Sequence, residues 1–161
     1  MLVSFNEICD SSRIWIFQSD LKIENNKIEL IINELEKFLV QWSSHGKELK
    51  CSYEIKYNLF IIIAVDSSVN NATGCSVDSL TNFILKIQED NNINFFNRLS
   101  IAYNEENEIK LNNLSNIKDM IKDKKFSPET IVYNNLVKTK KEYINDWKVP
   151  ALKSWHKNLF I

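Results

Sequence analysis

The hydrophobic pattern of the first half of the chain predicts three β-strands. Residues 13–18 (RIWIFQ) are rich in β-branched and aromatic side chains, a composition typical of strands. Apolar and polar residues alternate from Leu49 to Tyr57, so one face of that segment should be buried. Residues 59–65 (LFIIIAV) are apolar at every position, which predicts a strand covered on both faces. This last strand should therefore lie at the centre of a sheet.

Two longer segments have helical spacing. Between Asn26 and Trp42 apolar residues recur every three or four positions, which places them on one face of a helix. Residues 43–46 (SSHG) should end that helix, with Gly46 in the left-handed conformation common at helix C-termini. A second helix should begin at Gly74, and a short strand is predicted at residues 99–103.

The order strand, helix, strand, strand, helix, strand predicts an α+β fold with a ferredoxin-like βαββαβ core. In that fold about five antiparallel strands would form one sheet, with both helices on one face. A fifth strand is expected at residues 130–137, and shorter helices at residues 114–124 and 139–147. The apolar residues 154–161 should dock on the domain rather than extend into water.

Composition indicates one domain with an uneven charge distribution. The 161 residues are 44% hydrophobic and 25% charged, as in ordinary globular proteins. Residues 110–161 contain 11 lysines and 5 acidic groups, a net charge of +6, whereas residues 1–109 contain 9 basic and 16 acidic groups, a net charge of −7. The sequence thus predicts an acidic core, 1–109, and a basic C-terminal extension, 110–161, that packs on it or binds an anionic partner.

Nothing in the sequence predicts secretion or membrane insertion. Cys9, Cys51 and Cys75 are too few and too widely spaced for a disulfide framework. The N-terminus lacks the basic and apolar regions of a signal peptide. The longest uncharged apolar run, residues 59–65, is far shorter than the roughly 20 residues that cross a bilayer. We therefore expect a cytoplasmic protein without a membrane partner.

Five segments together carry a resemblance to one family: SRIWIFQSD (12–20), FLVQWSSHG (38–46), ATGCSVDS (72–79), TIVYNNLVKTK (130–140) and SWHKNLF (154–160). The chain resembles a small family of uncharacterised Bacteroidota proteins that often carry the label "ABC transporter ATPase". The resemblance spans nearly the whole chain and implies no particular activity, ligand or catalytic residue.

The sequence lacks the motif that an ABC transporter ATPase requires. An ABC-type ATPase needs the phosphate-binding loop G-x-x-x-x-G-K-[ST], whose backbone amides approach the phosphates. The two glycines, Gly46 and Gly74, are far apart, and neither is followed by Lys-Ser or Lys-Thr in that frame. The sequence therefore excludes ATP hydrolysis of this kind.

Cys75 is the candidate nucleophile. At the first turn of a helix, a thiol faces unpaired amides and the positive end of the helix dipole, which favour the thiolate. His45 or His156 could act as its base, oriented by Asp66 or Asp78. The alternative is that Cys75 is a small buried residue, and that His45 serves only at the end of the first helix.

The same helix start could bind a small anion without chemistry. Backbone amides of residues 74–76 and a hydroxyl would hold a phosphate or carboxylate, and Arg13 or Arg98 would supply the counter-charge. The side chain of Ser76 or Asp78 would cap the helix. No histidine or cysteine spacing is typical of a metal site, and no cofactor is predicted.

The basic extension suggests a different function, in RNA or ribonucleoprotein binding or in protein interaction. Its lysines could attract phosphates, and its aromatic residues could stack on unpaired bases. These residues are Lys138, Lys140, Lys141, Lys148, Lys153, Lys157, Tyr133, Tyr143, Trp147 and Trp155. The motif of an RNA-recognition domain is absent. Convergence of three or more of Cys75, Arg13, Arg98, His45 and His156 in one cleft would favour a site over an interaction surface.

Overall fold

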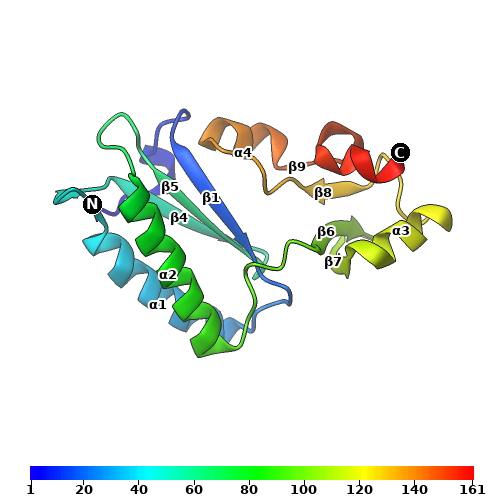
Figure 1. Cartoon of the computed structure of the whole chain (residues 1–161), viewed down its shortest axis with the longest axis horizontal. Helices are drawn as coiled ribbons and strands as arrows, with labels where there is room; N and C mark the ends of the chain where they lie inside the picture. Colours follow the sequence, from blue (N-terminus) through cyan, green and yellow to red (C-terminus); the bar gives the residue numbers. More distant parts are fainter.

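The computed structural model describes all 161 residues and shows an elongated molecule with the N-terminus in one half and the C-terminus in the other (Figure 1). The first half contains β1 (Arg13–Gln18), α1 (Asn25–Gln41), β4 (Cys51–Lys56), β5 (Phe60–Val65) and α2 (Gly74–Asn91). These elements occur where the hydrophobic pattern predicts them. The α+β class is confirmed.

The three strands of this half form an antiparallel sheet in the order β1-β5-β4. β5 lies at the centre and every one of its residues is buried, as its uninterrupted apolar run predicts. Both long helices pack on one face, where Leu35, Leu39 and Leu80 are fully buried against strand residues such as Ile61 and Ile63. Burying each such side chain contributes about 1.5–3 kcal/mol to stability, so this face forms a substantial core.

The segment after α1 differs from its prediction. α1 ends at Gln41, and Ser43–Ser44 (β2) and Lys47–Glu48 (β3) form a short antiparallel hairpin. His45 and Gly46 make the turn with φ of 51° and 77°. Consecutive positive φ values are those of a tight hairpin turn. His45 and Gly46 therefore form the turn of the β2–β3 hairpin, and the prediction that they end the helix is wrong.

The second half is built on another antiparallel sheet, in the order β7-β6-β8-β9. Its strands are β6 (Ser100–Glu105), β7 (Glu108–Asn113), β8 (Ile131–Tyr133) and β9 (Lys148–Pro150). The prediction of one sheet of about five strands is thus not confirmed, because the strands form three sheets. β6, which would be the fourth ferredoxin-like strand, pairs with β7 and β8 and not with β1.

Short helices complete this half. They are α3 (Leu114–Lys122), α4 (Lys140–Asp146) and the 3₁₀ turns η2 (Ala151–Lys153) and η3 (Trp155–Phe160), with a further 3₁₀ turn, η1 (Phe5–Glu7), near the N-terminus. Residues of α3 and η3 cover a small core around Phe126 and Val132. The apolar C-terminal segment packs on this core, and Ile161 is exposed.

One core joins the two halves. Phe60 and Ile62 of β5 pack there with Tyr133, Tyr143 and Trp147 from the C-terminal part, on the face of the first sheet opposite α1 and α2. The change of sheet comes before Ser100, earlier than the charge boundary at residue 109. β7 therefore groups with the C-terminal strands rather than with the acidic core.

No helix of this chain is both long enough and apolar enough to span a lipid bilayer.

Candidate functional site

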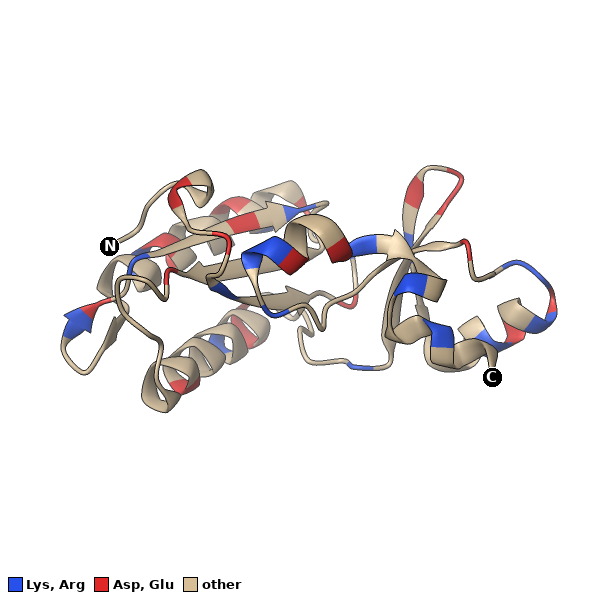
Figure 2. Ribbon diagram, turned by 90° about the horizontal axis from the view of Figure 1, so that it is seen from above, with Lys and Arg blue, Asp and Glu red and all other residues tan.

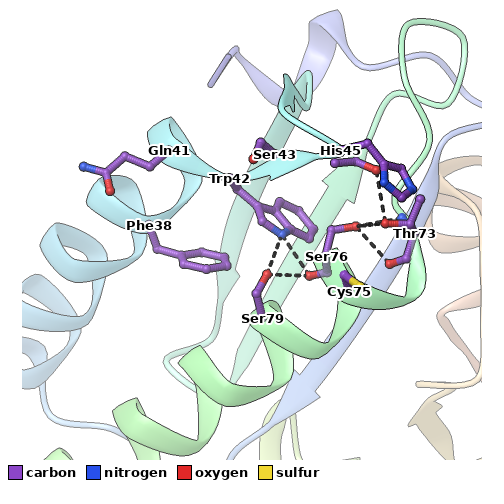
Figure 3. Close-up of a pocket in the computed structure, with 10 residues that line it drawn as sticks. Phe38, Gln41, Trp42, Ser43, His45, Thr73, Cys75, Ser76 and Ser79 are labelled. Carbon is purple, nitrogen blue, oxygen red and sulfur yellow. Dashed lines mark hydrogen bonds between the residues drawn. The ribbon is translucent and has the colours of Figure 1, made fainter.

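The structure divides the sequence-predicted site residues between two hollows. Cys75, Ser76 and His45 line a pocket of about 410 Å³ at the start of α2 (Figure 3). Arg98 and His156 line a cleft of about 630 Å³ between β1 and the second sheet. Neither hollow brings together three of the five residues whose convergence would favour a single site.

The remaining predicted residues lie outside both hollows. Gly74 begins α2, and the exposed Asp78 of the same helix lines neither hollow. Arg13 is exposed at the start of β1, where its guanidinium lies 4.5 Å from the centre of the Trp15 ring. The predicted cradle of Gly74, Ser76 and Asp78 with an arginine counter-charge is therefore not assembled at this helix start.

Hydroxyl groups of the first pocket cap α2. The Thr73 N–H donates to Ser76 Oγ at 2.7 Å, and Ser76 Oγ donates back to the Thr73 carbonyl at 2.9 Å. Ser44 Oγ donates to Thr73 Oγ1 at 3.1 Å, and Trp42 Nε1 donates to the Ser76 carbonyl at 2.9 Å (Figure 3). These contacts tie the hairpin and the end of α1 to the helix start, so capping already occupies the Ser76 hydroxyl.

Cys75 and His45 are both exposed beside this network. The buried interpretation of Cys75 is wrong, and Cys51 is the buried thiol, with a pKa raised to about 11 by desolvation. No hydrogen bond connects Cys75 with His45, so the structure contains no formed nucleophile–base pair.

Asp66, a predicted orienting residue, belongs to a separate cluster. Lys50 Nζ donates to Asp66 Oδ2 at 2.9 Å, and Ser68 Oγ donates to Asp66 Oδ1 at 2.6 Å. Burial would raise the pKa of this carboxyl, but hydrogen bonds from Ser68, Lys50 and Cys9 hold it well below its ordinary value. Asp66 is thus a charged partner for Lys50, and its hydrogen bonds come from Lys50 and Ser68 rather than from a histidine.

The lining of the cleft beside β1 is typical of a small-molecule binding site. The cleft lies between the free edge of β1, the loop after α2, β6, the loop after β8 and η3. Its lining is mostly apolar and aromatic, with a few polar groups, and contains no carboxylate. The lining residues are Ile16, Phe17, Gln18, Phe95, Phe96, Asn97, Arg98, Ser100, Ile101, Ala102, Tyr133, Asn135, Leu136, Trp155 and His156.

Arg98 is the one charged side chain of this cleft. It is exposed and forms no salt bridge. Phe96 and Leu136 also line the cleft, with 40% and 65% of their surface exposed. A guanidinium pairs with carboxylate or phosphate, and the exposed apolar side chains beside it can contact an apolar part of the same ligand.

His156 enters the cleft from η3 and is 2% exposed. Its Nδ1 lies 2.7 Å from Ser154 Oγ, and its ring stacks on Trp155 at a centroid distance of 4.0 Å. Desolvation lowers the pKa of His156 from 6.5 to about 4, so the imidazole is neutral at pH 7. The protein provides no hydrogen bond to Nε2, the other ring nitrogen of this cleft-lining residue.

A chain of side-chain amides fixes one end of the cleft. Trp147 Nε1 donates to Asn135 Oδ1 at 3.0 Å, and Asn135 Nδ2 donates to Gln18 Oε1 at 2.8 Å. Gln18 Nε2 in turn donates to the Ser100 carbonyl at 3.1 Å. The sequence contains no signal that marks Gln18 or Asn135, because their partners lie 82 and 117 positions away in the chain.

The basic C-terminal extension offers few aromatic rings to an RNA. Tyr133, Tyr143 and Trp147 are buried in the core that joins the two halves, so they cannot stack on bases. Lys140 is buried as well, with its ammonium on the carbonyls of Phe5 and Ile8. The other lysines of the extension lie at the surface, interspersed with acidic residues (Figure 2).

No group of three or more histidine, cysteine, aspartate or glutamate side chains is placed to hold a metal ion. Comparison of the chain with protein-family models, curated proteins and solved structures finds no match. The resemblance to the Bacteroidota family therefore stays a prediction.

Proposed function

We propose that this protein binds a small anionic ligand with an apolar body in the cleft between β1 and the second sheet. The observation that carries the proposal is an unpaired guanidinium, Arg98, in an aromatic cleft without any carboxylate. Lining groups such as Phe17, Phe96 and Trp155 would contact the apolar body, and His156 Nε2 would hydrogen-bond a polar atom of the ligand.

The charge of the ligand follows from the charges of the cleft. Arg98 is permanently cationic, and His156 is neutral at pH 7, so a ligand that reaches both meets one positive charge and one neutral imidazole. A carboxylate or phosphate on Arg98 would form charge-assisted hydrogen bonds that a neutral group cannot match.

Isothermal titration calorimetry with 2-naphthoate and with its uncharged analogue 2-naphthalenemethanol tests this proposal. We expect 2-naphthoate to bind more tightly than the alcohol, and Arg98→Ala to weaken 2-naphthoate about tenfold or more, because a hydrogen bond to a charged group contributes roughly 1.5–3 kcal/mol. Arg98→Lys should restore part of the loss, since lysine keeps the charge but not the forked geometry.

Arg13→Ala is the matched control. Arg13 is the other arginine of the chain and lies outside the cleft, so its loss should leave 2-naphthoate binding unchanged. Equal affinity for acid and alcohol, or an equal effect of both arginine variants, would show that the cleft does not recognise an anion.

We also propose a second candidate, a thiol-dependent function at the α2 pocket, because Cys75 and His45 line the same hollow. In this proposal a substrate brings the two side chains together. Mass spectrometry should show that iodoacetamide modifies Cys75 in the folded protein at pH 7 faster than it modifies N-acetylcysteine, and that His45→Gln removes the difference. A rate no faster than that of the free thiol would eliminate Cys75 as a nucleophile.

RNA binding by the basic extension, a cytoplasmic location and a ferredoxin-like topology of the core stay predictions. The order β1-β5-β4 with both helices on one face supports the last of these. For RNA binding, retention on immobilised RNA at low salt that is lost as salt rises would support the hypothesis.

A further inference from the structure

The edge of β1 that faces away from β5 is paired over only part of its length. Near its start, the Ile14 N–H donates to the Lys138 carbonyl at 2.9 Å, and the Lys140 N–H donates to the Ser12 carbonyl at 2.9 Å. Arg13 and Thr139 form an isolated antiparallel bridge at the same place. The segment before α4 therefore covers the first part of this edge.

The second part of the edge is open. In an antiparallel strand, alternate residues direct their backbone groups to opposite sides. Because the Ile14 N–H points away from β5, the backbone groups of Ile16 and Gln18 point the same way. Consistent with this alternation, the Ser19 N–H donates toward the β5 side, to the Leu59 carbonyl at 2.7 Å.

No other strand pairs with this open part. β1 pairs with β5 alone, and no hydrogen bond outside that ladder reaches the backbone of Ile16 or Gln18. In a complete ferredoxin-like sheet a fourth strand would lie here, but β6 belongs to the other sheet. Ile16, Phe17 and Gln18 instead line the 630 Å³ cleft that also contains Arg98.

We infer that the cleft binds an extended peptide segment with a free terminal carboxylate, which adds a short strand to the open edge of β1. The inference rests on the proposed function and specifies its ligand. Unpaired N–H and C=O groups of a strand edge are the groups to which an extended peptide binds by strand addition. A separation of about 3.3 Å per residue limits the paired part to two or three residues of the peptide.

The positive charge of Arg98 is the reason to expect a terminal carboxylate on the peptide. Arg98 lies in the same cleft as the open edge, and no acidic residue of this chain neutralises it. Successive side chains of an added strand point to opposite faces of the sheet, and the exposed apolar residues Phe96 and Leu136 would contact those on the cleft side. Backbone pairing would then supply affinity, and the carboxylate and side chains would supply specificity.

Amide hydrogen exchange measured by NMR on the full chain tests the inference. The probe is a pool of acetylated tripeptides covering every order of valine, leucine and phenylalanine, with free carboxyl termini. Bound peptide should slow exchange of the Ile16 and Gln18 amides about tenfold or more. The Trp15 and Phe17 amides face β5 and serve as internal controls that should not change.

Two modified peptide pools separate the contribution of backbone pairing to binding from that of the terminal carboxylate. N-methylation of the central amide should remove the protection at Ile16 and Gln18, and amidation of the carboxyl terminus should weaken binding about tenfold in the wild type. In Arg98→Ala the amidated and free peptides should bind equally. Arg13→Ala should behave as the wild type, since Arg13 lies at the covered part of the edge.

The outcomes distinguish this inference from the proposed function. If 2-naphthoate binds through Arg98 but no peptide protects Ile16 and Gln18, the strand addition is wrong and the anion site stands. If neither probe binds, both are wrong. Protection that grows with protein concentration alone would mean that a second copy of the chain occupies the edge, which would also overturn the peptide assignment.

Discussion

Lys140 places its ammonium group against the backbone carbonyls of Phe5 and Ile8, where it is 6% exposed and forms no salt bridge. The Phe5 ring lies 5.4 Å from the same group. Carbonyl oxygens and a ring face together replace the water that a buried cation loses. Lys140 thereby anchors the N-terminal segment to α4, and it is unavailable to a nucleic acid.

Removing this contact should destabilise the fold. Lys140→Met keeps the length of the side chain but leaves the two carbonyls without their donor, so we expect a loss of about 1–3 kcal/mol. Urea unfolding measures the change, with the exposed neighbour Lys141→Met as the control. Equal effects of the two variants would mean that the buried contact contributes nothing specific.

His156 should make stability depend on pH. Its pKa is lowered from 6.5 to about 4 in the folded protein, so between these values the unfolded chain binds a proton that the folded chain does not. Stability should therefore fall as the pH falls from about 6.5 to 4, by at most about 3 kcal/mol.

Urea unfolding at several pH values measures this loss. His156→Gln should flatten the curve in that range, whatever its stability at pH 7. A curve of the same slope in wild type and variant would show that His156 does not remain neutral on folding at these pH values.

Among the helices, the start of α2 is capped by a network that includes the buried hydroxyl of Ser76. Ser76 Oγ accepts from the Thr73 N–H and contacts its carbonyl, and Trp42 and Ser44 join the same network. The helix start is thus held to the hairpin after α1, although Cys75 beside it is exposed.

Ser76→Ala should leave the Thr73 N–H unpaired and lower stability by about 1–2 kcal/mol. For a chain of this size the melting temperature should drop by roughly 2–8 °C. Thermal denaturation followed by circular dichroism tests this expectation. Asn82→Ala, in the exposed middle of α2, should be neutral or slightly stabilising, because alanine favours helix. A drop no larger for Ser76→Ala would contradict the capping role.

At the scale of the whole molecule, Phe60 couples the two sheets. It is fully buried and lies 5.0 Å from both Tyr133 and Trp147, measured between ring centres. These rings come from β5, from β8 and from the residue after α4, so the core between the halves cannot open without disrupting both. Unfolding of the two halves should be cooperative.

Phe60→Ala should therefore lower the free energy of unfolding by about 3–5 kcal/mol. In the wild type, tryptophan fluorescence and far-ultraviolet circular dichroism should report one coincident transition in urea. The exposed Leu30→Ala is the control and should change stability by less than about 0.5 kcal/mol. Separate transitions for the two signals would show that the halves unfold independently.

The main helices and strands of the first half could be predicted from the sequence, whereas the hairpin at residues 43–48 could not. The periods of its apolar residues are physical properties of helices and strands, so β1, α1, β4, β5 and α2 form where those periods occur. The spacing of apolar residues indicates which face of a helix or strand is buried. It does not say which other element covers that face.

The pairing of the strands, by contrast, follows from contacts between segments that are distant in sequence. β6 has the apolar residues of a fourth sheet strand, but its pairing with β7 and β8 takes it away from β1 and leaves the β1 edge open. No sequence pattern links Arg98 with His156. They share a cleft because η3 packs beside the loop that follows α2. Such contacts depend on competition among strand edges and apolar faces that are distant in sequence, and no local pattern records the outcome of that competition.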